Sequence, residues 1–367
     1  MTGAAPAARL AGDTNRIDRF LGILPKRGGS DLHLSVGSPP IVRIDGELER
    51  MRYRALTEGD FFNLLGPITP ANLWEAFNAS GDVDFAYQMG QQARFRVNLM
   101  RQERGSAAVL RLIPSRIPTA EDLNLPPSVA GLYAVPRGLV LVTGPTGSGK
   151  STTLAAILDR MNKRLAHHVI TVEDPIEFVH TNDKSIFTQR EIGPDVGSFA
   201  EGVKAAIRED PDCLLVGEMR DLETMRMALT AAETGLLVFA TVHTNSAAKA
   251  VDRIIDAFPA AEQEQVRIVL SEALRGVVAQ QLLRKKGGGR VAAHEVLIGS
   301  SALSNSIREG KTSLINNQIA TGKSRGMISM DQTLTELVKN DVVEPGEALE
   351  RALDKESFKA MIAGQKK

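Results

Sequence analysis

The 367-residue chain has a single cysteine, 4% aromatic residues and no excess of charge of either sign. Because Cys213 stands alone, no disulfide can form within the chain, and no pair of cysteines is available to hold zinc. The 44 basic residues balance 44 acidic ones, so no overall field attracts nucleic acid or an anionic membrane. With few aromatic rings on which bases could stack, nucleic acid is not an expected partner.

Long apolar runs are missing as well. No stretch approaches the roughly 18 apolar residues of a membrane-spanning helix. The beginning of the chain, "MTGAAPAARLAGDTNR", contains Arg9 and Asp13 and lacks the apolar core of a secretion signal. We therefore expect a cytoplasmic protein. Since 43% of the residues are hydrophobic, a chain of this length can bury sizeable cores and is expected to form two domains.

Residues 1–113 are expected to form the first domain. Alternation with period two in "SDLHLSV", "PIVRIDGELERM", "DVDFAYQ" and "ARFRVNLMRQERGSAAVLRLI" predicts the strands of an antiparallel sheet. "TEGDFFNLLGPI" and "PANLWEAFNAS" predict short helices, which makes this a small α+β domain. The proline-rich segment 114–127 is interpreted as a linker and hinge.

Residues 128–367 have a different pattern. The apolar runs 138–144, 168–172, 213–217 and 236–243 predict buried strands that alternate with helices, as in a parallel α/β sheet covered on both faces. Beyond Ala260 the chain is expected to be mostly helical. In "AEQEQVRIVLSEALRGVVAQQLL" a helical stripe is predicted to contain Val266, Leu270, Leu274, Val277 and Leu282.

A phosphate-binding loop follows the first of these strands. "GPTGSGKS" (144–151) fits the pattern G-x-x-x-x-G-K-[ST], with a predicted strand before it and a predicted helix after it. Glycines allow backbone N–H groups to surround phosphate, Lys150 can reach the β- and γ-phosphates, and the Ser151 hydroxyl suits Mg²⁺. We therefore predict that ATP is bound by Gly144, Pro145, Thr146, Gly147, Ser148, Gly149, Lys150, Ser151 and Thr152.

Polar residues follow three other predicted strands. Glu218 comes after the strand in "DCLLVGEMRD", where a P-loop enzyme needs an acid for Mg²⁺, although Asp is usual there. The alternative is a surface ion pair with Arg220. His243 ends another strand and could sense the γ-phosphate or couple it to motion, or could simply bond a backbone carbonyl.

The stretch "TVEDPIEF" (171–178) places three carboxylates after a strand, at the sheet edge where ligands bind. Glu173 and Asp174 follow the strand directly, and Glu177 lies beyond Pro175. One of them could orient the attacking water, because positioning matters more than base strength in phosphoryl transfer. The residues alone do not rank the three.

These motifs, together with "REDPDCLLVGEMRDLETMRMALTAAETG" and "ATVHTNSAAKAVDRIIDAFP", resemble the secretion ATPase superfamily. Within it the chain resembles the type IV pilus retraction (twitching motility) ATPases, the PilT/PilU group, over nearly its whole length. The resemblance implies a RecA-like P-loop ATPase domain preceded by a small PAS-like α+β domain. It also implies a homohexameric motor that hydrolyses ATP with Mg²⁺ and works on an inner-membrane pilus platform protein, alone or beside a paralogous motor ATPase.

By this resemblance Glu177 is the catalytic glutamate and Glu218 the Mg²⁺-associated one, with Ser151 as the other metal-side residue. The spacing agrees, since Glu177 lies 27 residues after Lys150 (177 − 150) and Glu218 lies 68 after it (218 − 150). The histidine motif corresponds to His243. Glu173 and Asp174 are expected to shape the site.

Arginines of the N-terminal domain reach the nucleotide in this family, some of them across a subunit boundary. The matching positions here are Arg96 and Arg111; Arg94, Arg104 and Arg253 match less well. A cation at the transferring phosphoryl group can be worth on the order of 10³–10⁵ in rate. The alternative is that these arginines are exposed strand residues paired with carboxylates, worth about 1 kcal/mol or less.

The direction of work is the remaining question. A chain without a four-cysteine element or an additional N-terminal domain resembles the retraction motors more than the extension and secretion motors. However, the retraction motif "AIRNLIRE" is replaced here by "ALSNSIRE" (302–309), with Ser304 and Ser306 at the departures. An assembly or secretion ATPase, a paralogue that assists a sister motor, and a nonhydrolysing partner therefore remain as alternatives.

Overall fold

The computed structural model describes residues 15–44, 46–90, 92–113 and 116–363. The chain divides into two compact units, Met1–Ser115 and Arg116–Lys367, which are described separately below. Residues 1–14, in which no secretion signal is expected, and residues 114–115, at the start of the predicted linker, lie outside the described residues.

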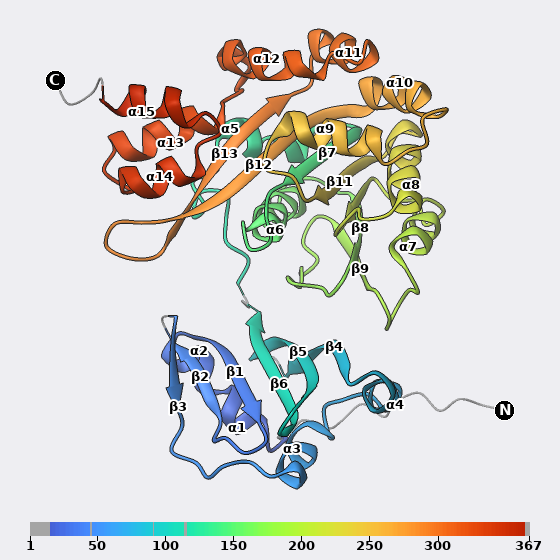
Figure 1. Cartoon of the computed structure of the whole chain (residues 1–367). Helices are drawn as coiled ribbons and strands as arrows, with labels where there is room; N and C mark the ends of the chain where they lie inside the picture. Colours follow the sequence, from blue (N-terminus) through green and yellow to red (C-terminus); the bar gives the residue numbers. More distant parts are fainter. Residues whose placement is uncertain (1–14, 45, 91, 114–115, 364–367) are drawn as a thin grey trace. The chain divides into compact units, whose positions relative to one another are not determined.

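The first unit is built on a six-stranded antiparallel sheet in the order β3-β2-β1-β6-β5-β4 (Figure 1). The strands are β1 (Gly29–Ser35), β2 (Ile41–Ile44), β3 (Glu47–Arg50), β4 (Asp82–Met89), β5 (Ala93–Gln102) and β6 (Gly105–Ile113). Alternation along β5 sends Phe95, Val97 and Leu99 into the core, where each is fully buried. Arg96 therefore lies on the opposite face, since successive side chains alternate across a sheet.

Four helices complete the first unit: α1 (Asp18–Leu21), α2 (Ile23–Arg27), α3 (Glu58–Leu65) and α4 (Ala71–Ser80). The predicted helix in "TEGDFFNLLGPI" begins at a capping box, in which Thr57 and Asp60 satisfy each other's backbone N–H groups. Its Phe61 and the Phe77 of α4 are fully buried in the same core as Phe95. The expected small α+β domain is therefore present.

The second unit contains a seven-stranded sheet in the order β13-β12-β7-β11-β10-β8-β9. The strands are β7 (Gly138–Thr143), β8 (His168–Glu173), β9 (Ile186–Glu191), β10 (Cys213–Val216), β11 (Leu237–Val242), β12 (Leu274–Arg284) and β13 (Arg290–Ile298). Neighbours are parallel except β12 and β13, which form an antiparallel pair at one edge. The four strands predicted from apolar runs are β7, β8, β10 and β11.

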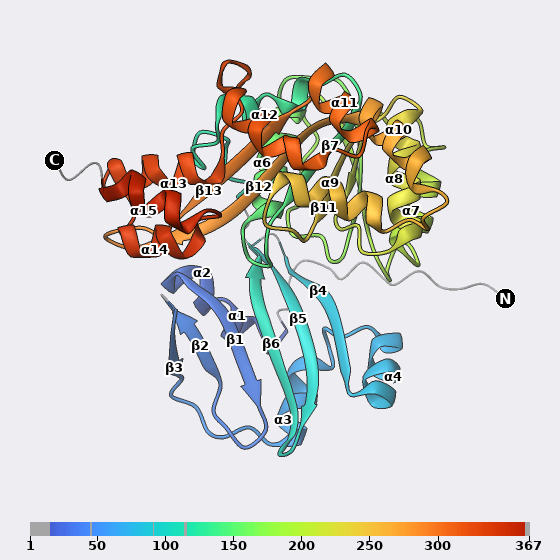
Figure 2. The same cartoon turned by 45° about the horizontal axis from the view of Figure 1, so that its top comes forward.

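Helices cover both faces of this sheet (Figures 1 and 2). Leu139 and Leu141 of β7 belong to one apolar cluster, and Val140 and Val142 to the cluster on the other face. The helices are α5 (Pro127–Ala130), α6 (Lys150–Asn162), α7 (Phe199–Ala206), α8 (Leu222–Glu233), α9 (Ala247–Asp256), α10 (Gln263–Ala273), α11 (Ser301–Arg308), α12 (Ile315–Thr321), α13 (Met330–Lys339), α14 (Pro345–Arg351) and α15 (Lys355–Ala363). Three short 3₁₀ helices are η1 (Leu132–Ala134), η2 (Thr312–Leu314) and η3 (Lys323–Arg325).

The prediction of one helical stripe through residues 266–282 was wrong from Leu274 onward. Helix α10 ends at Ala273, and Leu274 begins strand β12. This strand lies between β7 and β13 and is buried on both faces, so its apolar residues do not alternate with polar ones and show no period that excludes a helix. Residues 274–284 form a strand because they pair with β7, which lies more than a hundred residues earlier in the chain (274 − 143 = 131).

Residues 116–127, which we interpreted as part of a linker, pack within the second unit. Ala120 and Leu125 are buried in its core beside Val140 and Phe239. Glu121 accepts a hydrogen bond from Arg160 of α6 at 2.6 Å. From Arg116 onward, therefore, the segment is held by the seven-stranded sheet and its helices.

Candidate nucleotide-binding and hydrolysis site

The predicted phosphate-binding loop joins β7 to α6. Gly144, Gly147 and Gly149 have φ angles of 152°, 77° and 87°, which side chains rarely adopt. A Cβ atom on Gly144 would collide with the Gln280 carbonyl oxygen, whereas a Cβ on Gly147 would meet no atom within 4 Å. Helix α6 begins at Lys150, so Ser151 and Thr152 lie in its first turn. The loop thus presents backbone N–H groups and a helix N-terminus to open space, as anion binding requires.

Gln280 of β12 is hydrogen-bonded to this loop and to the first turn of α6. Its amide nitrogen donates to the Ser148 carbonyl at 2.7 Å, and its amide oxygen accepts from the Thr153 hydroxyl at 2.7 Å. The residue is only 2% exposed. Gln280 was not among the predicted site residues. Two glutamines within a buried apolar run were a usable signal, because buried amides must be hydrogen-bonded.

Lys150 binds carbonyl groups of the loop, and two of the predicted acids affect its pKa. Its ammonium donates to the carbonyls of Gly144 and Pro145 at 2.9 and 3.2 Å. Burial lowers the pKa of Lys150, while the carboxylates of Glu218 and Glu177 oppose that shift. Lys150, Glu177 and Glu218 all follow the carboxyl ends of strands of the same sheet, β7, β8 and β10, and the two carboxylates act on Lys150 through their charge.

Glu218 is shared by two cationic or donor side chains. His243 Nε2 lies 2.7 Å from Glu218 Oε1, and Arg220 Nε lies 2.5 Å from the same oxygen. Burial alone would raise the pKa of Glu218, but the hydrogen bond from Arg220 and the charge of His243 bring it below its ordinary value. The pair with Arg220 considered from sequence is thus present, and His243 meets a carboxylate rather than a backbone carbonyl.

The three crowded carboxylates have separate environments. Glu173 Oε1 accepts from the Thr171 hydroxyl at 2.7 Å and from the Gln189 amide at 3.3 Å. Burial raises the pKa of Glu173 to about 7, against these bonds and a further one from the Glu177 N–H. Asp174 is exposed and lies near Arg220, whereas Glu177 lies near Lys150. The geometry therefore distinguishes Glu177 from its two neighbours.

The two predicted arginines are cross-strand neighbours in the first unit. Arg96 on β5 lies opposite Arg111 on β6, and Arg111 lies opposite Asp31 on β1. Arg111 Nε donates to the buried Asp31 carboxylate at 2.8 Å, and Arg96 Nε approaches Asp84 at 3.4 Å. Both arginines pair with aspartates within this unit, yet the Arg111 side chain is 69% exposed and so remains open to a ligand.

The amino-acid sequence is similar to those of known proteins. The profile of the Type II/IV secretion system protein family matches residues 77–362. The chain belongs to this family. It is 49% identical to the type IV pilus retractation ATPase PilT of Pseudomonas aeruginosa, over 93% of this chain and 99% of that protein. It is 47% identical to a twitching motility protein of Neisseria gonorrhoeae, over 87% of this chain and 86% of that protein.

A solved structure agrees with this assignment. The crystal structure of the pilus retraction motor PilT with bound ADP has a TM-score of 0.88 and 43% identity, covering 95% of this chain and 100% of that one. The expected fold class, a RecA-like P-loop domain preceded by a smaller α+β domain, is confirmed. The resemblance to the retraction ATPases of the secretion family is confirmed too.

The departure from the family's retraction motif lies mainly on the inner side of α11. Ser304 donates to the Ser271 carbonyl of α10 at 2.6 Å, and Ser306, 5% exposed, accepts from the Gln318 amide of α12 at 2.8 Å. The exposed residues of the motif, Asn305 and Arg308, keep the family's identity. The surface that a partner would contact is therefore less altered than the sequence suggested.

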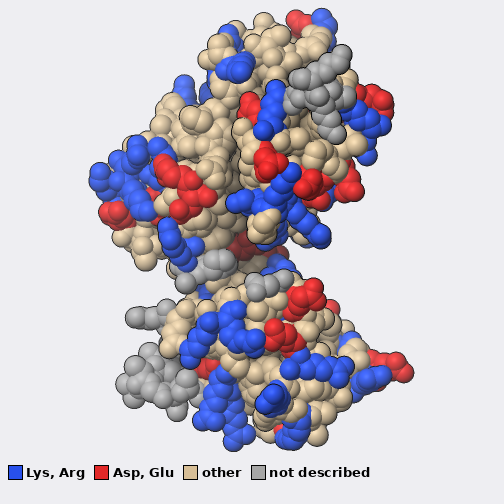
Figure 3. Space-filling view, turned by 90° about the vertical axis from the view of Figure 1, so that its left-hand side faces the viewer, with Lys and Arg blue, Asp and Glu red and all other residues tan. Residues whose placement is uncertain are grey.

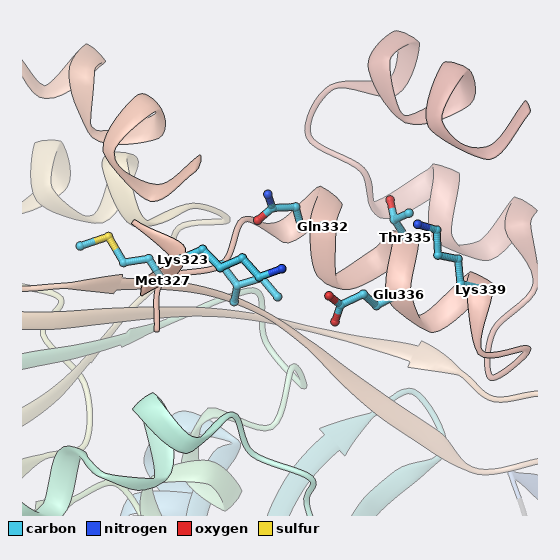
Figure 4. Close-up of a pocket in the computed structure, with 7 residues that line it drawn as sticks. Lys323, Met327, Gln332, Thr335, Glu336 and Lys339 are labelled. Atoms are coloured by element: carbon cyan, nitrogen blue, oxygen red, sulfur yellow. The ribbon is translucent and has the colours of Figure 1, made fainter. Parts of the chain in front are cut away.

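Two further observations concern metal binding and a pocket outside the nucleotide site. Among the described residues, no group of three or more His, Cys, Asp and Glu side chains could hold a metal ion alone, so Mg²⁺ would need phosphate oxygens as additional ligands. A pocket beside α13 has a volume of about 210 Å³. Figure 4 shows residues that line it, among them Lys323, Met327 and Lys339. None of the predicted nucleotide-site residues lines that pocket.

Proposed function

We propose that this protein is a hexameric motor ATPase that drives type IV pilus retraction, the disassembly of pilins in twitching motility. One observation carries the chemical part of the proposal. A P-loop with Lys150, and the acids Glu177 and Glu218, follow the carboxyl ends of three strands of one parallel array, which is where ligands bind in such sheets. The pilus-specific part rests on the near full-length similarity to retraction motors.

ATP would bind with its phosphates on residues 144–152. Backbone N–H groups and the N-terminus of α6 would hold the β-phosphate, and Lys150 would leave its carbonyl partners to neutralise the γ-phosphate. The Ser151 hydroxyl and the Glu218 carboxylate fit a Mg²⁺ ion that also binds phosphate oxygens, and this ion would supply Lewis-acid charge neutralisation.

Glu177 would orient the attacking water. Its backbone N–H donates to Glu173, which fixes the turn after β8. Glu173 is itself occupied by bonds from Thr171 and Gln189, so its carboxylate is less free to meet water than that of Glu177. Because the transition state of phosphoryl transfer is loose, placement of the water contributes more than basicity.

His243 would couple the nucleotide state to movement, since it shares Glu218 with Arg220. Arg96 and Arg111 of a PAS-like domain, residues 1–113, would add positive charge at the phosphates, in part across the subunit boundary of the hexamer. Binding and release of this contact would rotate the first domain. Of the segment 114–127 that we interpreted as the hinge, residues 116–127 pack in the second unit.

We place the motor in the cytoplasm, at the inner-membrane platform protein of the pilus, with a paralogous motor as a further possible partner. Within the described residues, no helix combines the length and apolar character needed to span a bilayer. We propose no nucleic-acid substrate. Basic and acidic side chains lie next to each other on the face of the second unit shown in Figure 3, without a single-sign groove.

An assembly or secretion ATPase and an assisting paralogue are the alternatives. The exposed Asn305 and Arg308 of α11, which keep the retraction motif, favour retraction, and the half-buried Ser304 is the departure that argues against it. Deletion of the gene distinguishes these functions. Loss of a retraction motor increases surface pili and stops twitching, loss of an extension motor removes surface pili, and loss of an assistant leaves twitching partly active.

Glu177→Gln tests the chemistry directly. We expect the purified variant to bind ATP with nearly unchanged affinity and to lose turnover, because an amide, with one acceptor oxygen and one donor nitrogen, would not orient the attacking water as the carboxylate does. Glu173→Gln, four residues earlier at the end of β8, is the matched comparison and should keep most activity. If Glu177→Gln turns over ATP like the wild type and Glu173→Gln does not, the water-orienting residue is Glu173 and the proposal is wrong.

A further inference from the structure

Glu295 on β13 is a buried carboxylate to which neither the sequence motifs nor the proposed mechanism assigns a role. It is 2% exposed and lies opposite Ala279 in the β12–β13 pair. Its Oε1 accepts from the Ala247 N–H at 2.7 Å, and its Oε2 accepts from the Met330 N–H at 3.5 Å. Ala247 and Met330 are the first residues of α9 and α13, so one carboxylate lies between two helix N-termini.

Carboxylates are stabilised at helix N-termini by unpaired N–H groups and by the helix dipole. Both helices already have a hydroxyl cap, Ser246 for α9 and Ser329 for α13. Glu295 therefore adds a second acceptor to the α9 end, beside Ser246, and a further one to the α13 end, and it joins the two ends to each other. Burial raises the pKa of Glu295, while the two N–H groups oppose that shift.

The α9 end is also the end of the His243 turn. His243 and Thr244 follow β11, Ser246 caps α9, and Ala247 begins it. The other side of this turn is fixed by Thr143, the residue before the P-loop. Its hydroxyl accepts from the Thr244 N–H at 2.8 Å and donates to the Thr244 carbonyl at 2.7 Å. The turn is thus held at one end by Thr143 and at the other by Glu295.

The same hairpin supports the site on both of its faces. Gln280 pairs with His294 across the ladder and holds the P-loop on one face. Glu295, the residue after His294, points to the other face and holds the His243 turn. A displaced α9 would carry Thr244 and His243 with it, since His243 lies only four positions before Ala247 (247 − 243 = 4).

We propose that Glu295 is a positioning residue for ATP hydrolysis, which keeps His243 against Glu218 by holding the N-terminus of α9. The inference rests on the role given to His243 in the proposed function. Glu295 does not touch the nucleotide in this arrangement. Its effect passes through Ala247, Ser246 and Thr244 to the imidazole.

Glu295→Gln is the first test, because the amide keeps the size of the side chain but turns one acceptor into a donor that faces a backbone N–H. We expect kcat of the full-length protein to fall about 10-fold, as for misplaced catalytic groups, with KM for ATP and Kd for ADP changed less than about 2-fold. In a His243→Ala background the same substitution should lower kcat less than about 2-fold, since residues that act through one another are not additive.

Three outcomes are informative. An equal fall in both backgrounds, or no fall in the wild-type background, would overturn the proposal. Full activity of His243→Ala alone would instead contradict the role of His243, so the two failures are distinguishable. If Glu295→Gln does not fold, Ser246→Ala removes another cap of the same helix end, and its effect must likewise disappear in the His243→Ala background.

Asp331→Asn is the matched structural control. Asp331 also accepts two backbone N–H groups, from Leu353 at 2.8 Å and Asp354 at 3.0 Å, but it acts within the α13–α15 region. We expect this variant to lower Tm without changing kcat. If Asp331→Asn reduces kcat as much as Glu295→Gln does, the effect of Glu295 is general destabilisation and the proposal fails.

Discussion

His243 Nε2 lies 2.7 Å from Glu218 Oε1, so the loops that follow two adjacent parallel strands, β11 and β10, meet at one carboxylate oxygen. Arg220 binds that oxygen from the solvent side, with a side chain that is 75% exposed. A change in the charge next to Glu218, such as loss of the γ-phosphate, would alter the balance between these two partners. The relationship offers a route from hydrolysis to the helix that follows His243.

Removal of the imidazole should affect turnover more than binding. We expect His243→Ala to lower kcat about 10- to 100-fold, because Glu218 would lose the partner that orients it. Kd for ADP should change little, since the P-loop is untouched. Arg220→Ala is the control, and we expect it to lower kcat less than about 5-fold, because exposed ion pairs contribute about 1 kcal/mol or less. Steady-state ATPase assays decide, and a larger effect of Arg220→Ala would reverse the assignment.

Loss of the Gln280 amide should loosen the P-loop. Gln280→Leu leaves the Ser148 carbonyl and the Thr153 hydroxyl without this partner, at about 1–3 kcal/mol for each buried group. We expect a lower Tm and about 10-fold weaker ADP binding, measured by calorimetry. Gln281→Leu is the control, since that amide donates to the Arg351 carbonyl instead. It should reduce Tm without weakening ADP binding.

Stability should depend on pH through Glu173. Its pKa is raised from 4.5 to about 7, so the folded protein keeps a proton that the unfolded chain has released above pH 4.5. The free energy of unfolding therefore falls between about pH 4.5 and 7. Glu173→Gln is neutral throughout, so its Tm should rise relative to wild type as pH increases over this range. A difference in Tm that is constant with pH would show that the raised pKa is not a feature of the folded state.

Restoring the family's leucine at position 306 should be harmful alone. Ser306→Leu places a larger side chain at a buried position and removes one of the two acceptors of the Gln318 amide, the other being the Ala302 carbonyl, which we expect to cost about 1–3 kcal/mol in unfolding free energy. The double variant Ser306→Leu with Gln318→Leu should recover most of the loss. Chemical denaturation measures both, and ATPase activity should stay within about 3-fold in each, because α11 lies outside the nucleotide site.

Much of the site follows from local pattern. A glycine-rich loop between an apolar strand and a helix has few structural solutions, so the position of Lys150 and the open face of residues 144–151 were predictable. Glu218 and His243 were predictable for a related reason. Polar residues directly after buried parallel strands meet at one edge of the sheet, whatever the order of the strands. The motifs also carried the family resemblance that the comparisons confirm.

Other features depend on contacts between distant parts of the chain. Residues 274–284 have the same apolar pattern as a buried helix, and only their pairing with β7 and β13 makes them a strand. That pairing places Gln280 under the P-loop, 132 residues from Ser148 (280 − 148), and Glu295 at the start of α9. No local period marks either residue, because a buried amide or carboxylate is defined by the N–H and C=O groups it meets.

The three carboxylates of residues 171–178 show most clearly what local sequence determines and what tertiary structure determines. The amino-acid sequence by itself determined that an acidic turn follows a buried strand near a γ-phosphate site, because strand direction and the proline settle that much. Which acid is free to act was decided only by tertiary structure. Gln189 of β9 and the hydroxyl of Thr171 bind Glu173, Arg220 lies near Asp174, and Glu177 remains beside Lys150. Burial and hydrogen bonding, which depend on the packed neighbours, separate side chains whose sequence patterns are alike.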